Sequence, residues 1–330
     1  MSPFEEPFTP PIGLSNPHLQ TILSSLGRKN ILPRREARFI AAAEERIIEI
    51  EGLQQMVHVN TQPEPEQAPL VMLIPGWLGH VNSTYVLSAG KALWQAGFNV
   101  VRINLRDHGE TAHLNEGLFH SALLDEVVAL IDHILDDFNA TKAGLMGYSL
   151  GGNFALRIAE RRRHLATLAV CPALSPSATI HRIESNRIYS EYFLRKWRRL
   201  YKQKERAFPG KYDFDQAMRL SSMQALTDYF VKYHTEYAST DEYFAAYDIT
   251  GDYLNGVDAH ILAAMDDPII RMEDLDALPT AINQHRIAHG GHGAFLDSWQ
   301  LTSWGDRFAS HFFCSKLLKN NAKETTFGVS

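Results

Sequence analysis

Gly147-Tyr148-Ser149-Leu150-Gly151-Gly152 is the stretch that decides the fold of this 330-residue chain. It follows a short apolar segment at 143–146 and precedes an alanine-rich, helix-forming segment at 153–159. A serine with glycines two residues to either side, between a strand and a helix, is typical of a sharp turn that raises the serine hydroxyl above a sheet. We therefore predict that Ser149 is a nucleophile. The alternative is an incidental serine in a glycine-rich turn.

Composition excludes several classes of protein. Apolar residues make up 45% of the chain, which is enough for a large core and unlike a disordered chain. A length of 330 residues exceeds the usual single domain, but α/β folds commonly reach it as one core with an insertion. The net charge of −6 argues against nucleic acid as the main partner.

Cysteine usage and targeting signals predict a cytoplasmic protein. Cys171 and Cys314 lie too far apart to suggest a disulfide framework, which suits a reducing compartment. Cys171 falls within an apolar run and is expected to be a small buried hydrophobe. Residues 1–6 show no basic region followed by an apolar stretch, so no signal peptide is predicted. No run of about 18 apolar residues occurs, so we expect no membrane-spanning helix.

Apolar runs and helical spacings alternate along the chain, which predicts a mostly parallel sheet flanked by helices. Strands are predicted at 46–50, 56–59, 70–74, 99–105, 143–146, 167–174, 259–265 and 285–288, and helices at 85–96, 120–138, 153–159 and 298–313. The alternation stops between 175 and 256, where aromatic and charged residues follow helical spacing. We expect this stretch to be a helical cap inserted over the sheet, between core parts at 1–174 and 257–330.

A serine nucleophile needs a base, and the base needs an orienting acid. Asp266-Asp267 and His289-Gly290-Gly291-His292 each follow a predicted strand, at the sheet edge where α/β active sites assemble. Asp267 is preferred as the acid because it lies farther into the loop, with Asp266 in reserve. His292 is preferred over His289 as the base because the glycines on either side give its loop the freedom to reach Ser149.

Two backbone N–H groups are predicted to form an oxyanion hole. The first belongs to Leu150, the residue after the serine. The second is expected from Trp77 in the loop 75–79, which follows the strand at 70–74. The alternative for this loop is an ordinary glycine-rich connection between a strand and a helix.

These motifs resemble the α/β-hydrolase superfamily and, within it, the YheT-like hydrolases (AB hydrolase 4-type family), over most of residues 12–313. Residues 13–21, with an Asn-x-His-x-Gln-Thr pattern, carry the most family-specific similarity, and the segments at 147–153, 266–268 and 290–292 match the serine, acid and base regions. The resemblance implies an α/β-hydrolase fold with carboxylesterase activity. One departure is Pro75-Gly76, where the family usually has His-Gly before the oxyanion residue.

Other patterns carry weaker signals. His285, His289 and His292 with the two aspartates match no standard zinc spacing, and no phosphate-binding loop occurs, so neither a metal nor a cofactor is predicted. The basic, aromatic-containing stretch 195–204 is interpreted as a solvated helix face. The alternative is a contact with a membrane surface or an anionic substrate.

Together the motifs predict a serine hydrolase that cleaves small-molecule carboxylic esters through an acyl-enzyme, with Ser149, His292 and Asp267 as the triad. Aromatic residues of the cap are expected to line the acyl pocket, although they could equally form the cap's own core. The alternatives are acyl transfer or thioester hydrolysis with the same triad, and a non-catalytic binding protein on a hydrolase scaffold.

Overall fold

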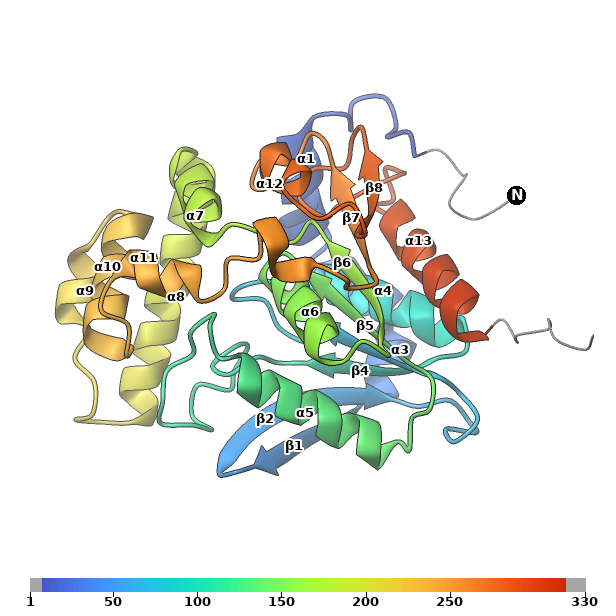
Figure 1. Ribbon diagram of the computed structural model, residues 1–330, viewed down its shortest axis with the longest axis horizontal. Helices are drawn as coiled ribbons and strands as arrows, with labels where there is room; N and C mark the ends of the chain where they lie inside the picture. Colours follow the sequence, from blue (N-terminus) through green and yellow to red (C-terminus); the bar gives the residue numbers. More distant parts are fainter. Residues whose placement is uncertain (1–7, 319–330) are drawn as a thin grey trace, which may run out of the picture.

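One eight-stranded sheet forms the centre of the molecule (Figure 1). The computed structural model describes residues 8–318. The strand order across the sheet is β1-β2-β4-β3-β5-β6-β7-β8. Along the chain the strands are β1 (Glu44–Ile50), β2 (Leu53–Asn60), β3 (Leu70–Ile74), β4 (Asn99–Ile103), β5 (Ala143–Tyr148), β6 (Ala166–Val170), β7 (Ala259–Ala264) and β8 (Asn283–Ile287).

Strands β3 to β8 pair in parallel, and β1 and β2 add an antiparallel hairpin at one edge. The predicted pair around Gly52 is confirmed: Glu51 and Gly52 both have positive φ, which suits a tight turn between twisted strands. Every residue of β3, β4 and β5 is buried. Continuous burial is expected where helices cover both faces of a parallel sheet.

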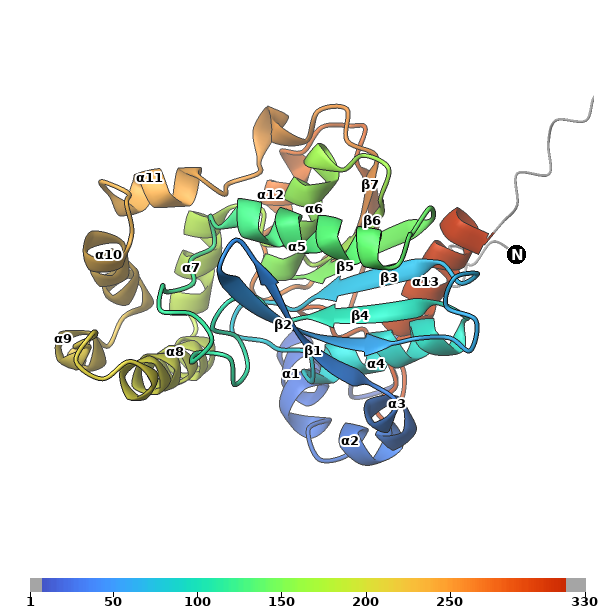
Figure 2. The same cartoon turned by 90° about the horizontal axis from the view of Figure 1, so that it is seen from below.

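Two layers of helices cover the sheet (Figure 2). On one face α4 (Thr84–Gln95) packs against α13 (Trp304–Phe313), and on the other lie α5 (Leu124–Asp137) and α6 (Leu150–Arg161). The short elements α12 (Met272–Asp276), η3 (Gly251–Leu254) and η4 (Cys314–Leu318) complete the core. The predicted fold class, an α/β-hydrolase fold with a mostly parallel sheet, is therefore confirmed.

Three predicted boundaries are wrong by four residues or more, each for a local reason. The strand predicted at 167–174 ends at Val170, because Cys171 adopts a φ of 45° that no strand tolerates. Helix α5 begins only at Leu124, because residues 120–123 form a turn. Helix α13 begins at Trp304 rather than at 298, since Ser298 and Thr302 hydrogen-bond each other through their hydroxyls, 2.6 Å apart. Such local side-chain bonds compete with helix formation.

Five helices lie between β6 and β7 and extend from one end of the sheet (Figure 1). They are α7 (Pro176–Glu184), α8 (Arg187–Ala207), α9 (Asp215–Arg219), α10 (Met223–His234) and α11 (Thr240–Ala245). Their aromatic rings pack on one another, as Tyr201 and Phe214 do with centroids 4.0 Å apart. Helix α8 also reaches the core, where Trp197 packs edge-on against Trp77 at 5.0 Å. The inserted helices therefore stand over the carboxyl end of β3.

A buried ion pair fastens α8 to the core. The Lys204 ammonium donates to Asp107 Oδ1 at 2.7 Å and to the backbone carbonyls of Asn115 and Gly117 at 2.6 and 3.0 Å. The side chains of Lys204 and Asp107 are both fully buried. All three ammonium hydrogens thus have acceptors, which is the condition under which a buried charge is tolerated.

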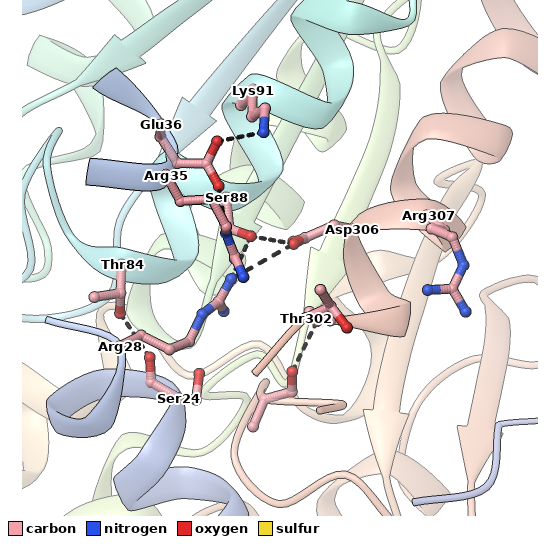
Figure 3. A network of polar contacts seen from close by, with 12 residues as sticks. Ser24, Arg28, Arg35, Glu36, Thr84, Ser88, Lys91, Thr302, Asp306 and Arg307 are labelled. Atoms are coloured by element: carbon pink, nitrogen blue, oxygen red, sulfur yellow. Dashed lines mark hydrogen bonds and ion pairs between the residues drawn. The ribbon is translucent and has the colours of Figure 1, made fainter. Parts of the chain in front are cut away.

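The N-terminal segment is attached to the core by a second buried network (Figure 3). The N-terminal segment comprises α1 (Pro17–Ile22), η2 (Leu23–Gly27), α2 (Leu32–Arg35) and α3 (Ala37–Ala41). Arg28, just after η2, donates to Ser88 Oγ of α4, which in turn donates to Asp306 of α13. Arg28 also lies 3.8 Å from the Asp306 carboxylate, with its own side chain 1% exposed. One guanidinium thus joins three elements that are far apart in sequence.

Residues 1–6, on which the prediction of no signal peptide rests, lie outside the described residues. Within residues 8–318, no helix is both long and apolar enough to cross a membrane.

Replacing Arg28 by alanine should lower the free energy of unfolding by about 3 kcal/mol, because the Asp306 carboxylate would stay buried without its cation. Arg34, an exposed arginine nearby in the same segment, is the matched control, and Arg34→Ala should change stability by less than about 0.5 kcal/mol. Urea denaturation followed by far-UV circular dichroism measures both variants. Equal losses in the two would show that the network contributes nothing specific.

Candidate active site

Ser149 lies on a turn whose backbone only glycine neighbours permit. It forms the N-cap of α6 with φ 52° and ψ −117°, a conformation that non-glycine residues rarely adopt. A Cβ on Gly147 would lie 2.0 Å from the Gly151 carbonyl oxygen, and one on Gly151 would lie 2.4 Å from the Ile74 carbonyl oxygen. The two glycines therefore let helix and strand approach as closely as the sequence pattern predicts.

Hydrogen bonds on both sides hold this strained residue in place. The Ser149 N–H donates to the Val170 carbonyl at 3.0 Å, and the Ser149 carbonyl accepts from Ala173 at 3.1 Å. Asn153, one turn into α6, donates through Nδ2 to the carbonyls of Ala173 and Tyr247, both at 2.8 Å. The sequence analysis assigned Asn153 no role. Its contacts tie the serine turn to the end of β6 and to the inserted segment.

Asp267 and His292 form a hydrogen-bonded pair. His292 Nδ1 lies 2.9 Å from Asp267 Oδ2, and the Asp267 side chain is 1% exposed. Asp267 Oδ1 also accepts from the N–H groups of Ile269 and Ile270, at 2.7 and 3.0 Å. Because a carboxylate only accepts, Nδ1 of His292 carries the proton and Nε2 is left as the basic nitrogen.

The neighbouring carboxylate has different partners. Asp266 lies 3.2 Å from His289 Nδ1 and accepts from the Gly291 N–H at 2.9 Å. His289 is 47% exposed, whereas His292 is 15% exposed. Asp266 and His289 therefore brace the loop that carries His292, and the structure pairs the two residues that the sequence analysis preferred.

The N-terminal segment supports the histidine loop directly. Thr21 Oγ1 accepts from the His292 N–H at 2.9 Å. Gln20, fully buried, accepts from the Leu296 N–H at 2.7 Å and donates to the Leu14 and Leu296 carbonyls at 2.8 and 3.0 Å. The similarity of residues 13–21 to the YheT-like hydrolases predicted no function for Gln20 or Thr21. Only the folded chain shows that they hold the loop of His292.

The two predicted oxyanion donors belong to segments that both adjoin the serine. The Leu150 N–H is the first of α6, where helix geometry leaves backbone donors without an intrahelical acceptor. Trp77 follows Gly76, where a Cβ would lie 3.2 Å from Ser149 Cβ, so the loop runs against the serine. Within residues 8–318, neither N–H donates to a protein acceptor. The turn after Pro75 is closed by a 2.8 Å bond from Gly79 N–H to the Gly76 carbonyl.

A cavity of about 850 Å³ opens onto Ser149, Leu150, Trp77 and His292. Ser149 and His292 line the same space but are not hydrogen-bonded to each other in this structure. Such contacts often form only when a substrate is bound. Aromatic residues between 175 and 256, which were expected to line the acyl pocket, border this cavity: Tyr189, Tyr192, Phe193, Trp197, Phe230, Tyr243, Phe244 and Tyr247.

Cys171 lies beside the predicted acid and base but is unsuited to act as a nucleophile. Its sulfur, Asp267 and His292 have ligand atoms within 4.8 Å of one another. The residue is 1% exposed, and burial, together with the Asp267 charge, raises the pKa of its thiol well above the ordinary value. A thiol that stays protonated is a poor nucleophile toward carbonyl groups. Cys171 is therefore a buried apolar side chain, as predicted.

Comparison with known proteins identifies relatives over most of the chain. Residues 71–309 match the model of the alpha/beta hydrolase family. YheT of Escherichia coli (strain K12), named as a proposed esterase, is 23% identical over 304 residues, which cover 88% of this chain and 87% of that protein. A proposed esterase/lipase of Haemophilus influenzae is 28% identical over 106 residues, covering 32% of this chain and 31% of its own length.

Solved structures of similar fold cover most of this chain. Est1E from Butyrivibrio proteoclasticus superposes with a TM-score of 0.54 at 15% identity, covering 83% of this chain and 99% of that one. A soluble variant of monoglyceride lipase from Saccharomyces cerevisiae gives a TM-score of 0.54 at 11% identity, covering 84% and 96%. At such low identities the likeness concerns the fold alone.

Proposed function

The chain belongs to the alpha/beta hydrolase family and is YheT-like within it, and from this premise we propose that it hydrolyses carboxylic esters through an acyl-enzyme on Ser149. The observation that carries the proposal is the buried Asp267–His292 hydrogen bond of 2.9 Å, at the edge of the cavity that Ser149 lines. The esterase names among the relatives support the choice of an ester as substrate.

The first chemical step is attack on the ester carbonyl. Nε2 of His292, free of its proton because Nδ1–H points to Asp267, accepts the proton of Ser149 Oγ as that oxygen bonds to the acyl carbon. The carboxylate of Asp267 stabilises the imidazolium that forms. Its other oxygen is held by two backbone N–H groups, so the acid keeps its orientation throughout.

Negative charge then develops on the former carbonyl oxygen. Within the described residues 8–318, the N–H groups of Leu150 and Trp77 have no protein acceptor, and they are available to bind this oxyanion. The N-terminal end of α6 adds the positive end of its dipole at the same point. Collapse of the intermediate releases the alcohol, which takes the proton from His292. Water then gives a proton to His292 and attacks the acyl carbon. Ser149 takes that proton back as the carboxylic acid product leaves.

The inserted helices select the acyl chain in this proposal. Trp197, Phe230 and Tyr243 are buried and border the cavity, so together they form an apolar wall. Tyr201, one turn along α8 from Trp197, stacks on Phe214 at 4.0 Å and belongs to the cap's own core. In this proposal some cap aromatics line the acyl pocket and others form the cap's own core, the two roles that the sequence left open.

Ser149→Ala should abolish ester hydrolysis, with a loss of about 10⁴-fold or more in kcat, because no other group in the proposed mechanism attacks the acyl carbon. A fluorophosphonate probe should label the wild-type protein and not the variant. The variant should keep the wild-type circular dichroism spectrum. Labelling that persists at another residue would refute the assignment of the nucleophile.

Asp267→Asn should lower kcat by about 10⁴-fold, because an amide in place of the carboxylate favours the wrong tautomer of His292. Asp266→Asn is the matched control: it weakens a brace on His289 and Gly291, and we expect a loss below about 10-fold. Steady-state rates on p-nitrophenyl butyrate compare the two. A larger loss for Asp266→Asn would reverse their roles.

Phe230→Leu should shift the preferred acyl length upward, because a smaller side chain in the apolar wall enlarges the cavity. Each additional methylene accommodated should raise kcat/KM about 10-fold for the longer ester. Tyr233, on the same helix and 51% exposed, provides the control Tyr233→Leu. Rates over p-nitrophenyl esters of increasing length measure the profile, and identical profiles for both variants would exclude Phe230 from the acyl pocket.

A further inference from the structure

The basic stretch of α8 divides into cations with different partners. Lys204 is buried in the ion pair with Asp107. Arg198 donates to the Leu220 carbonyl at 2.5 Å, and the largely exposed Arg199 pairs with Glu110 at 3.1 Å. Lys196 differs from all three. In the described part of the chain, it forms neither an ion pair with a carboxylate nor a side-chain hydrogen bond.

Lys196 lies on the side of α8 that faces the cavity. Phe193 and Leu200, three and four residues away along the helix, line the same cavity that Lys196, Ser149 and His292 line. Lys196 is half-buried there, with its ammonium 5.1 Å from the centroid of the Tyr192 ring. Burial, together with the nearby Lys29 and Arg199, lowers the pKa of Lys196 to about 8, so it is still mainly protonated at pH 7.

The acidic residues around the cavity already have partners. Asp107 is paired with Lys204 at 2.7 Å. Glu110 binds both Arg199 and the amide of Gln203, each at 3.1 Å. Glu45, whose side chain is 58% exposed, is hydrogen-bonded to His58 at 3.1 Å. None of these carboxylates neutralises Lys196, which therefore retains an uncompensated positive charge against the cavity.

Two further groups favour an anion at this place. Lys29, exposed after η2, lines the same cavity and lies close enough to Lys196 to lower its pKa. His80 also lines the cavity; its Nδ1 accepts from the Asn82 N–H at 3.2 Å, so Nε2 carries the proton and is a donor. Burial lowers the pKa of His80 to about 4, which keeps it a neutral donor at pH 7. A cation, a second cation nearby and a neutral donor thus border one space.

We propose that Lys196, with Lys29 and His80, forms a subsite for an anionic group, a phosphate or a carboxylate, carried by the ester substrate. This inference rests on the proposed esterase function, because the anion is part of the molecule that Ser149 attacks. A partly buried ammonium without a counterion is costly, and a bound anion removes that cost through charge-assisted hydrogen bonds. The apolar wall then holds the hydrocarbon part while the subsite holds the charged part.

The test compares esters that differ only in charge. One pair is 1-octanoylglycerol and 1-octanoylglycerol 3-phosphate; the other is methyl octanoate and monomethyl suberate. Wild-type protein should prefer the charged member of at least one pair, and that pair identifies phosphate or carboxylate as the anion. Lys196→Gln should lower this preference, measured as the ratio of kcat/KM values, by about 10-fold. Lys196→Arg should largely retain it.

Lys202→Gln is the matched control, since Lys202 is exposed on the same helix and does not line the cavity. It should leave the preference at the wild-type value. A preference absent from wild type, or lost equally in Lys196→Gln and Lys202→Gln, would overturn the subsite. Equal losses of kcat/KM for charged and neutral esters in Lys196→Gln would also overturn it, because they would indicate a purely structural role.

A binding measurement separates failure of the subsite from failure of the proposed function. In the Ser149→Ala background, isothermal titration with octyl phosphate and with octanoate requires no catalysis. Adding Lys196→Gln should weaken binding of the preferred anion about 10-fold. Loss of this dependence would overturn the subsite even if esters are hydrolysed. Binding that depends on Lys196 in a protein that cleaves no ester would support the subsite and reject the esterase proposal.

Discussion

The contact between α6 and the end of β3 is the constraint on which the rest of the site depends. Gly151 lies so close to the backbone of Ile74 and Pro75 that a single added carbon would come within 2.4 Å of either carbonyl oxygen. This contact forces Ser149 into its positive-φ conformation and brings the Trp77 loop against the serine. The positions of the proposed nucleophile and of the proposed oxyanion donors are therefore set by backbone packing, before any side chain is positioned.

The proposed acid and base depend instead on segments far away in the sequence. Asp267 is oriented by the N–H groups that follow it, but the loop of His292 is held by Thr21 and Gln20 of the N-terminal segment. That segment is in turn attached to α4 and α13 through Arg28 (Figure 3). Residues that contribute no strand to the sheet thus determine where the base lies.

The sequence predicted most of the fold, because the buried strands and the serine turn are encoded locally. Continuous apolar runs such as Leu70–Ile74 identify strands without tertiary information, and the glycines around Ser149 identify the turn. The prediction of helix boundaries failed where local side-chain hydrogen bonds, such as that between Ser298 and Thr302, prevented the helix from starting before Trp304. Asp267 and His292 could be preferred from loop position. The contact of Gln20 with the loop of His292 and the position of Lys196 at the cavity could not be predicted, since both arise from long-range packing.

The most direct test of the central claim is to isolate the covalent intermediate. Wild-type protein mixed with excess p-nitrophenyl octanoate and quenched in acid within the first turnover should carry one octanoyl group, detected by intact-protein mass spectrometry. Proteolysis and tandem mass spectrometry should locate that group on Ser149. An octanoyl group on Cys171 or another residue, or release of p-nitrophenol with no covalent adduct at any quench time, would contradict the account.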